Sequence, residues 1–215
     1  MKESVYKKED TKKKILEEAL KLFSERGYDA VSVGEIAKEV GIKAPSLYSH
    51  YPSKQAIFDA IVCETSEKYK EYTNGIAIHM HNAKMDVSLF SGVSENLLIE
   101  KIHQIFKYSL HDVTISRFRK MMTIEQFRTP ELSKLYSDRY NDRIVLYHAK
   151  IFEALIKNGE IKNENPETLA MMYVAPIINL LCICDRQPER EEECIKNLDE
   201  HVKLFYRTYN TLADK

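Results

Sequence analysis

The stretch SVGEIAKEVGIKAPSLYSHYPSK, residues 32–54, constrains the fold more than any other part of the chain. Ser32 and Glu35 have the spacing of a capping box, in which each side chain bonds the other residue's backbone N–H at the start of a helix. Gly41 predicts the end of that helix, because glycine readily adopts the left-handed conformation found there. Pro45 predicts the first turn of a new helix, where an N–H is not needed. Two short helices joined by a turn that contains glycine are typical of a helix-turn-helix.

Two further residues bear on this interpretation. Ala37 lies where the two helices are expected to cross, and a small side chain there permits close approach. Leu47 is expected to face back into a small core from the second helix. The spacing of Ala37, Gly41 and Leu47 also fits an alternative, an ordinary helical hairpin in an all-α protein. The capping box and Pro45 favour a helix-turn-helix that binds DNA.

The composition favours a mostly helical protein. Of the 215 residues only six are glycine and six proline, and 30% are charged; average usage is about 7% glycine and 5% proline. The N-terminal sequence MKESVYKKEDTKKK contains no apolar segment typical of a secretory signal. The longest apolar run, around residues 171–184, is shorter than the ~20 residues that span a membrane. We therefore expect a cytoplasmic protein that does not interact with a membrane.

The cysteines do not form a recognisable metal or disulfide motif. Cys182 and Cys184 are separated by one residue, which is the wrong spacing for a zinc knuckle. In a reducing compartment the expected state of all four cysteines is a free thiol. The sequence also shows no glycine-rich phosphate loop and no nucleophile elbow. We therefore expect no metal, no cofactor, no catalytic residues and no enzymatic activity.

Hydrophobic periodicity predicts helices along most of the chain. An amphipathic helix is expected over residues 10–26, ending at Gly27, and another from Lys54 to about Thr73. Residues 74–93 show no clear element. Further helices are expected from Ser94 and over about 113–127, 130–158, 165–181 and 188–212. The sequence therefore predicts an all-α fold.

The flanks of the opening stretch extend its pattern. The chain reads Thr11-x-x-x-Ile15-Leu16-x-x-Ala19-x-x-Leu22-Phe23-x-x-x-Gly27-Tyr28, then Ser32-Val33-x-x-Ile36-Ala37, Val40-Gly41-Ile42 and Leu47-Tyr48-x-His50-Tyr51-x-Ser53-Lys54. This pattern resembles the N-terminal domain of TetR-family (tetracycline-repressor-like) transcriptional regulators. The resemblance implies a three-helix helix-turn-helix domain at residues 9–69 and a larger helical domain at 70–215 that binds an effector and dimerises. One departure is Lys43, where the family often has Ser or Thr as the cap of the recognition helix.

Two groups of residues are expected to contact DNA. The first residues of a recognition helix reach base edges in the major groove, and we expect four to face it: Lys43, Ala44, Pro45 and Ser46. The resemblance implies phosphate contacts by four others: Ser32, Tyr48, His50 and Lys54. For Lys54, its place at a helix N-terminus, where free N–H groups attract phosphate, favours the same role. An ordinary surface lysine is the alternative.

The C-terminal domain offers two sets of candidate residues. The resemblance implies a pocket for a small apolar or aromatic effector, with seven candidate lining residues: Phe106, Phe118, Met121, Met122, Phe127, Tyr147 and Tyr173. The alternative for these side chains is an ordinary core. An apolar seam with alternating spacings of three and four predicts packing of the last helix against others at ~20°; its residues are Ile195, Leu198, Val202, Phe205 and Tyr209. Packing within the subunit is one interpretation, and the resemblance implies a four-helix bundle with a second copy.

The resulting expectation is a homodimeric repressor that a small-molecule effector releases from a palindromic operator in double-stranded DNA. The centres of the two half-sites are expected to be separated by one turn of the DNA helix, ~34–36 Å, or by a multiple of it. The alternative is a DNA-binding regulator without a small-molecule effector, which acts through a protein partner or as an activator.

Overall fold

A computed structural model describes the backbone of residues 2–80 and 82–211, and within these ranges the side chains from residue 9 onward. The described residues form helices and no strand; a single antiparallel bridge joins Ile161 to Asn210. The all-α prediction is confirmed. The chain divides into two compact units, which we call the N-terminal unit (residues 1–69 and 112–134) and the C-terminal unit (residues 70–111 and 135–215).

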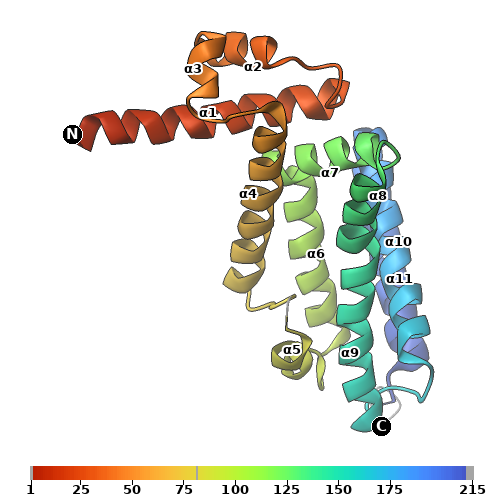
Figure 1. Cartoon of the computed structure of the whole chain (residues 1–215). Helices are drawn as coiled ribbons and strands as arrows, with labels where there is room; N and C mark the ends of the chain where they lie inside the picture. The colour runs from red at the N-terminus through yellow and green to blue at the C-terminus, as the bar shows by residue number, and fades with distance from the viewer. Residues whose placement is uncertain (1, 81, 212–215) are drawn as a thin grey trace. The chain divides into compact units, whose positions relative to one another are not determined.

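The N-terminal unit is built on the first helix, which packs against the second and the seventh. Its elements are α1 (Lys2–Arg26), α2 (Val33–Val40), α3 (Ala44–Tyr48), the first part of α4 (Lys54–Gly75), α7 (Val113–Glu125) and the start of α8 (Pro130–Ser137) (Figure 1). The apolar stripe predicted for α1 is buried in full: Ile15, Leu16, Ala19, Leu20, Leu22 and Phe23. Helix α1 begins earlier than the predicted residue 10, and it ends as predicted before Gly27, whose φ is 79°.

The local signals of the helix-turn-helix are confirmed. Ser32 Oγ accepts the Glu35 N–H at 3.2 Å, and Glu35 Oε2 accepts the Ser32 N–H at 2.8 Å. The Ser32 hydroxyl also donates to Glu35 Oε2, at 2.8 Å. The Ser32 N–H first, then the Ser32 hydroxyl and the Arg26 guanidinium, lower the pKa of Glu35 to about 2. Gly41 ends α2 in the left-handed conformation, with φ 80°. Ser53 Oγ accepts the Ala56 N–H at 3.0 Å and so caps α4.

Residues 112–134 belong to the N-terminal unit, although the sequence analysis placed them in the 70–215 domain. Asp112 caps α7 by accepting the N–H groups of Thr114 and Ile115 at 3.0 and 3.1 Å. The Lys68 ammonium donates to the same carboxylate at 2.8 Å and thereby ties α7 to α4. The division into functional domains at residue 69 stays a proposal, and the compact N-terminal unit includes this additional segment.

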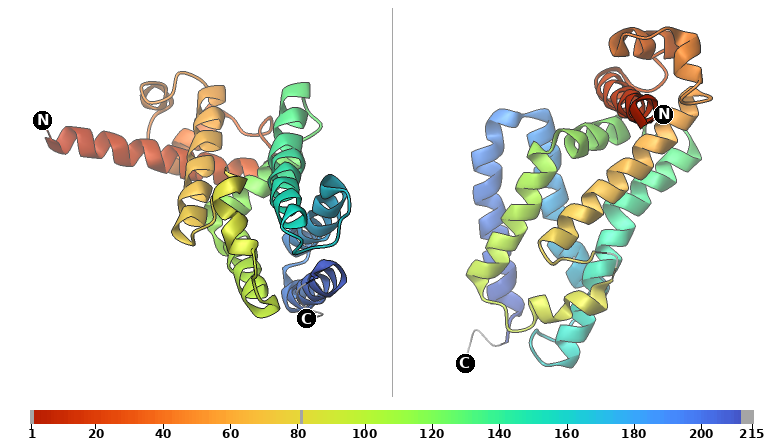
Figure 2. Two further views of the ribbon diagram at one scale, coloured as in Figure 1. Left: turned by 90° about the horizontal axis from the view of Figure 1, so that it is seen from below. Right: turned by 90° about the vertical axis from the view of Figure 1, so that its left-hand side faces the viewer.

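The C-terminal unit is a bundle in which α10 packs against both α9 and α11 (Figures 1 and 2). Its helices are α5 (Ala83–Phe90), α6 (Glu95–His111), α9 (Arg143–Lys157), α10 (Pro166–Arg186) and α11 (Glu191–Tyr209). The long helix expected over 130–158 is interrupted by a π-helical turn at Asp138–Asp142. A 3₁₀ turn at Pro188–Arg190 precedes α11. Helix α5 lies in the stretch for which the sequence showed no element.

Helix α10 is a longer apolar segment than the sequence indicated for residues 171–184. The helix has 21 residues and, by length and composition alone, is long and apolar enough to cross a membrane. Its inner residues are nevertheless buried in the bundle; they include Leu169, Ala170, Tyr173, Val174, Leu180 and Leu181. A core helix of a folded domain has the same composition, so this feature is a weak indication of a membrane span.

Candidate nucleic-acid interface

Helix α3 is a five-residue helix that buries one side and exposes the other. Leu47 is fully buried, as predicted, whereas Pro45 and Ser46 are exposed and 52% of the Tyr48 surface is accessible. Ala44 is half-buried, so it contributes less surface than its neighbours. The helix thus presents a short, weakly polar surface of the size that fits a major groove.

Lys43 stands at the N-cap of α3 with φ −80° and ψ 146°, an extended conformation typical of that position. Its side chain makes no capping hydrogen bond among the described residues and is exposed. Pro45 has no N–H, and the N–H groups of Ser46 and Leu47 donate to the Lys43 carbonyl oxygen at 2.9 and 3.2 Å. The exposed Lys43 ammonium is therefore the group at the start of α3 that attracts a DNA phosphate.

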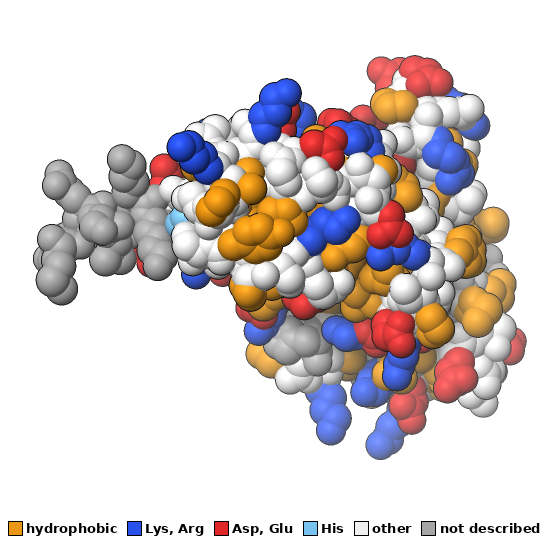
Figure 3. All heavy atoms as spheres, turned by 45° about the horizontal axis from the view of Figure 1, so that its top comes forward, with side chains coloured by type: hydrophobic (Ala, Val, Ile, Leu, Met, Phe, Trp, Pro, Cys, Tyr) orange, Lys and Arg blue, Asp and Glu red, His pale blue; other side chains and the backbone are white. Residues whose placement is uncertain are grey.

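The positive charge around α3 is dispersed. Figure 3 shows Lys and Arg side chains separated by apolar and uncharged side chains on the face that carries α2 and α3. The Lys14 ammonium donates to the Val40 carbonyl at 3.0 Å, so one nearby cation is used inside the unit. A surface with few separate cations neutralises few phosphates, which limits the affinity of one copy for DNA.

Among the four residues assigned to phosphate contacts, Tyr48 and Ser32 are exposed, whereas His50 and Lys54 are half-buried. The hydroxyl and N–H of Ser32 are already engaged with Glu35. Of the exposed candidates, Lys43, Ser46 and Tyr48 offer polar groups and Pro45 offers an apolar contact, so these four are the best-placed candidates for DNA contacts.

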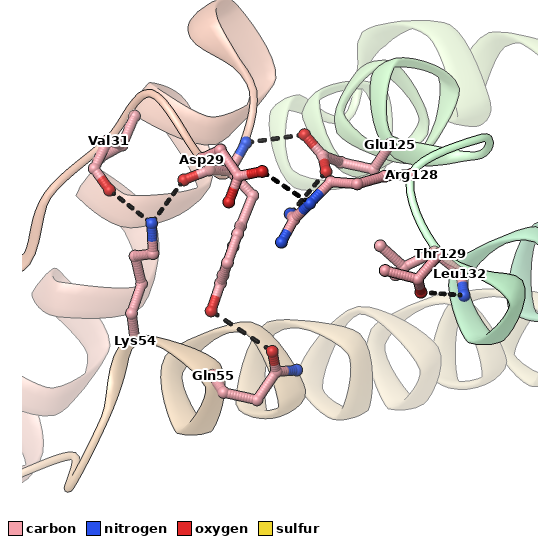
Figure 4. Close-up of polar contacts among 9 residues, drawn as sticks. Asp29, Val31, Lys54, Gln55, Glu125, Arg128, Thr129 and Leu132 are labelled. Carbon is pink, nitrogen blue, oxygen red and sulfur yellow. Dashed lines mark hydrogen bonds and ion pairs between the residues drawn. The ribbon is translucent and has the colours of Figure 1, made fainter.

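The Lys54 side chain, which was expected to contact a DNA phosphate, binds backbone groups of its own unit. Its ammonium donates to the carbonyl oxygens of Tyr28 and Val31, both at 2.8 Å (Figure 4). The same nitrogen lies 4.2 Å from the centroid of the Tyr28 ring. The loop before α2 has carbonyl groups without a ladder partner, and Lys54 satisfies them. This geometry supports an internal structural role for Lys54 in place of the phosphate contact.

Replacing Lys43 with serine tests the departure at the α3 cap. Serine at an N-cap accepts an N–H from the first turn, so we expect the N-terminal unit to be stabilised by ~0.5–1 kcal/mol in denaturant unfolding. The loss of one phosphate contact is expected to lower the slope of log K against log salt by about 1 for DNA binding. Lys84→Ser, at an exposed position of α5, is the matched control for loss of charge. An unchanged salt slope in the Lys43 variant would contradict the DNA contact.

The seven candidate pocket residues do not come together. Three of them, Phe118, Met121 and Met122, form the buried face of α7 in the N-terminal unit, and 88% of the Phe127 surface is exposed. The other three lie in the C-terminal unit, in two core clusters: Phe106 in one, and Tyr147 and Tyr173 in the other. The amphipathic pattern of α7 reflects packing on α1, so the alternative of an ordinary core describes most of this set.

The predicted dimer seam is occupied inside the subunit. Leu198 and Val202 pack in a core cluster with residues of α6 and α10, and Phe205 packs in the cluster of Phe152 and Tyr173. Ile195 and Tyr209 are half-buried at the edges of these clusters. The periodicity of α11 thus correctly marks a buried face. That face is buried by the chain itself.

The outer faces of α10 and α11 form an open groove of ≈ 830 Å³. Three large apolar side chains of its lining are exposed: Met171 by 60%, Met172 by 48% and Leu204 by 68%. None of these three residues is among the interface candidates predicted from the sequence. The signal for Met171 and Met172 was the presence of apolar residues on more than one face of α10, which a helix with a single buried face does not need.

Comparisons with known proteins agree with this architecture. A model of the bacterial regulatory proteins of the tetR family matches residues 15–61, which include every residue assigned to DNA contacts. Over 203 residues, 94% of the chain, it is 24% identical to YttP, a probable HTH-type transcriptional regulator of Bacillus subtilis, and the match covers 89% of that protein.

A second relative is a Staphylococcus aureus protein, IcaR, the HTH-type negative transcriptional regulator of the biofilm operon icaADBC. It is 32% identical over 120 residues, which are 56% of this chain and 55% of that protein. Among solved structures, the SmeT–triclosan complex superposes with a TM-score of 0.67 and 17% identity over 94% of this chain and 92% of that one. SmeT is the repressor of the Stenotrophomonas maltophilia multidrug efflux pump SmeDEF.

Proposed function

Because the chain belongs to the TetR family of transcriptional regulators, we propose that it acts as a homodimer that represses transcription by occupying a palindromic operator. DNA binding and transcriptional regulation are family properties, and they agree with the expectation that the chain is not an enzyme. The observation that carries the proposal is the exposed face of α3, which follows α2, a helix capped at both ends, in a helix-turn-helix. Its place of action is the cytoplasm, where bacterial DNA lies.

The small size of the α3 surface supports a dimer. One copy offers Lys43, Pro45, Ser46 and Tyr48 as accessible contacts, which is little for a specific complex. Two copies read two half-sites, and a twofold axis in the protein matches a palindrome in the DNA. The groove of α10 and α11, with Met171, Met172 and Leu204 exposed, is the apolar surface on which we place the pairing. Of the seam inferred from the sequence, Phe205 and Tyr209 line this groove, and Ile195, Leu198 and Val202 do not.

Release by a small apolar or aromatic effector is the second part of the proposal. It is supported by the complex of SmeT, a protein of similar fold, with triclosan. An effector can release DNA only if it binds the released conformation more tightly than the DNA-bound one. A coupling free energy of ~1–3 kcal/mol is typical. The division of the seven candidate pocket residues between two units favours the alternative, a regulator that acts through a protein partner or as an activator.

The test of DNA binding uses fluorescence anisotropy with duplexes that tile the region upstream of the gene. We expect one duplex to bind specifically, with an affinity that falls as salt rises, and footprinting to show two half-sites. Light scattering is expected to give the mass of a dimer, twice the 25.1 kDa of one chain. Binding of all duplexes alike, or a monomer bound to a single half-site, would contradict the proposal.

The effector is tested separately by thermal shift and by displacement of DNA, with triclosan as the first probe. A rise in melting temperature together with release of the duplex supports the repressor released by a ligand. A panel of neutral aromatic compounds that changes neither quantity, beside a protein recovered with the DNA-bound dimer, favours the alternative.

A further inference from the structure

The loop between α1 and α2, residues 27–31, is held by side chains from helices distant in the sequence. Lys54 at the start of α4 binds the carbonyl oxygens of Tyr28 and Val31, each at 2.8 Å. The Tyr28 N–H donates to Glu125 Oε1 at the end of α7, at 2.7 Å and 97 residues away in the sequence (Figure 4). The loop lacks a regular hydrogen-bond ladder, so these side chains determine its conformation.

The Tyr28 ring contacts two cations. The Lys54 ammonium lies 4.2 Å, and the Arg128 guanidinium 4.5 Å, from its centroid. The Phe58 ring meets it edge-on at 5.5 Å, and the Tyr28 hydroxyl donates to Gln55 at 3.3 Å. Cations over an aromatic face are attracted by its quadrupole, more strongly where water is excluded. Tyr28 is therefore fixed through its ring and its hydroxyl as well as through its backbone.

The end of α7 is fitted closely to this loop. The Glu125 side chain is only 4% exposed, and it pairs with Arg128 at 2.8 Å while it accepts the Tyr28 N–H. Arg128 also pairs with Asp29 at 2.8 Å. A Cβ atom on Gly27 would lie 3.1 Å from Glu125 Oε1, so the backbone and the carboxylate are already in near contact. A buried carboxylate with two donors holds the loop against α7 at a defined distance.

We propose that Glu125 and Arg128 are positioning residues for DNA binding, which fix the orientation of α2 and α3 by clamping the loop through Tyr28. The loop leads directly into Ser32, the N-cap of α2, so a displaced loop displaces the helix-turn-helix. Both residues lie outside residues 15–61, the segment that the family model matches, and neither is among the residues assigned to DNA contacts. The inference rests on the proposed DNA binding and adds a determinant of affinity that touches no DNA.

The test compares Glu125→Ala and Glu125→Gln with Glu131→Ala, which removes an exposed carboxylate from the first turn of α8 in the same corner. The ligand is the duplex that the parent protein binds, and binding by the parent tests the proposed function independently. We expect Glu125→Ala to lower the affinity about tenfold, as the loss of a hydrogen bond to a charged group does. Glu125→Gln should lose less, because its amide oxygen still accepts the Tyr28 N–H. The control should bind as the parent does.

Two readouts separate positioning from direct contact and from stability. The slope of log K against log salt should stay at the parent value, because no phosphate contact is lost. Amide hydrogen exchange should become faster at residues 28–35 while the core of α1 keeps its protection. If Glu125→Ala does not fold, Arg128→Gln, at a partly exposed site, replaces it with the same expectations. Parent affinity in the folded variants, even with a lower melting temperature, or a reduced salt slope would overturn the inference.

Discussion

Replacing Leu204 with glutamate is expected to leave the protein monomeric and to lower its operator affinity by about 100-fold or more. Leu204 is 68% exposed on α11 and lines the groove together with Met171 and Met172 of α10. A dimer that pairs through this groove would bury two carboxylates in an apolar surface, and unpaired buried charges cost several kcal/mol. A monomer cannot bind both half-sites at once, so it loses the gain of ~10²–10⁴ in affinity that binding of the second half-site gives the dimer. Light scattering and anisotropy on the same samples measure both effects.

Two further variants make this result specific to the groove. Leu146→Glu introduces the same charge at a leucine of α9 that is 53% exposed, and it should remain dimeric and bind DNA. Leu198→Ala removes a fully buried side chain from the seam inferred from the sequence. It should destabilise the C-terminal unit by ~2–5 kcal/mol and leave the mass of the folded protein unchanged. A dimeric Leu204→Glu protein beside a monomeric Leu198→Ala protein would return the interface to the predicted seam.

Features determined by neighbouring residues could be predicted from the sequence. The capping box of Ser32 and Glu35, the left-handed Gly41 and the start of α4 after Ser53 all depend on contacts within four residues. The buried stripe of α1 follows from helical periodicity in the same way. These local rules suffice to place α3, and therefore to identify the surface that carries the candidate DNA contacts.

Features determined by distant residues could not be predicted. The apolar side of α7 has the same pattern whether it packs on α1 or lines a pocket, so Phe118 and Met121 were assigned to the wrong surroundings. Lys54 looks like a phosphate ligand because its position beside a helix N-terminus is local, whereas the carbonyl groups it binds are at least 23 residues away. Periodicity in α11 identifies a buried face without identifying the helix that buries it.

The position of helix α5 is also determined by a contact between residues distant in the sequence. Asp86 of α5 makes this contact. This carboxylate is fully buried and accepts three hydrogen bonds: from the His79 N–H at 2.6 Å, from the His79 ring Nδ1 at 2.8 Å and from the Tyr147 hydroxyl at 2.6 Å. Burial first, and then the bond to Asp86, raise the pKa of Tyr147, so its hydroxyl stays protonated and donates. One side chain therefore joins the loop before α5 to α9.

Asp86→Ala is expected to destabilise the C-terminal unit by ~3–5 kcal/mol, because it removes the shared acceptor of three hydrogen bonds and each donor left without a partner costs ~1–3 kcal/mol. The change leaves the buried Tyr147 hydroxyl and the half-buried His79 N–H without their acceptor. Asp86→Asn keeps one acceptor oxygen and should lose ~1–3 kcal/mol. Asp142→Ala, which removes an exposed carboxylate from the same unit, is the control and should stay within ~0.5 kcal/mol of the parent.

Urea unfolding followed by circular dichroism measures the stability of the Asp86 variants. Because the chain has two units, we expect the substitutions to affect one unit and not the other. The transition of the C-terminal unit should move to lower urea, while the Tyr28 loop of the N-terminal unit keeps its hydrogen-exchange protection. Tyr147→Phe isolates the contribution of one hydrogen bond, ~1 kcal/mol or somewhat more for a charged acceptor. Equal stability of the Asp86→Ala and Asp142→Ala proteins would show that α5 is held by its apolar contacts with α9 alone, because the buried carboxylate would then contribute nothing.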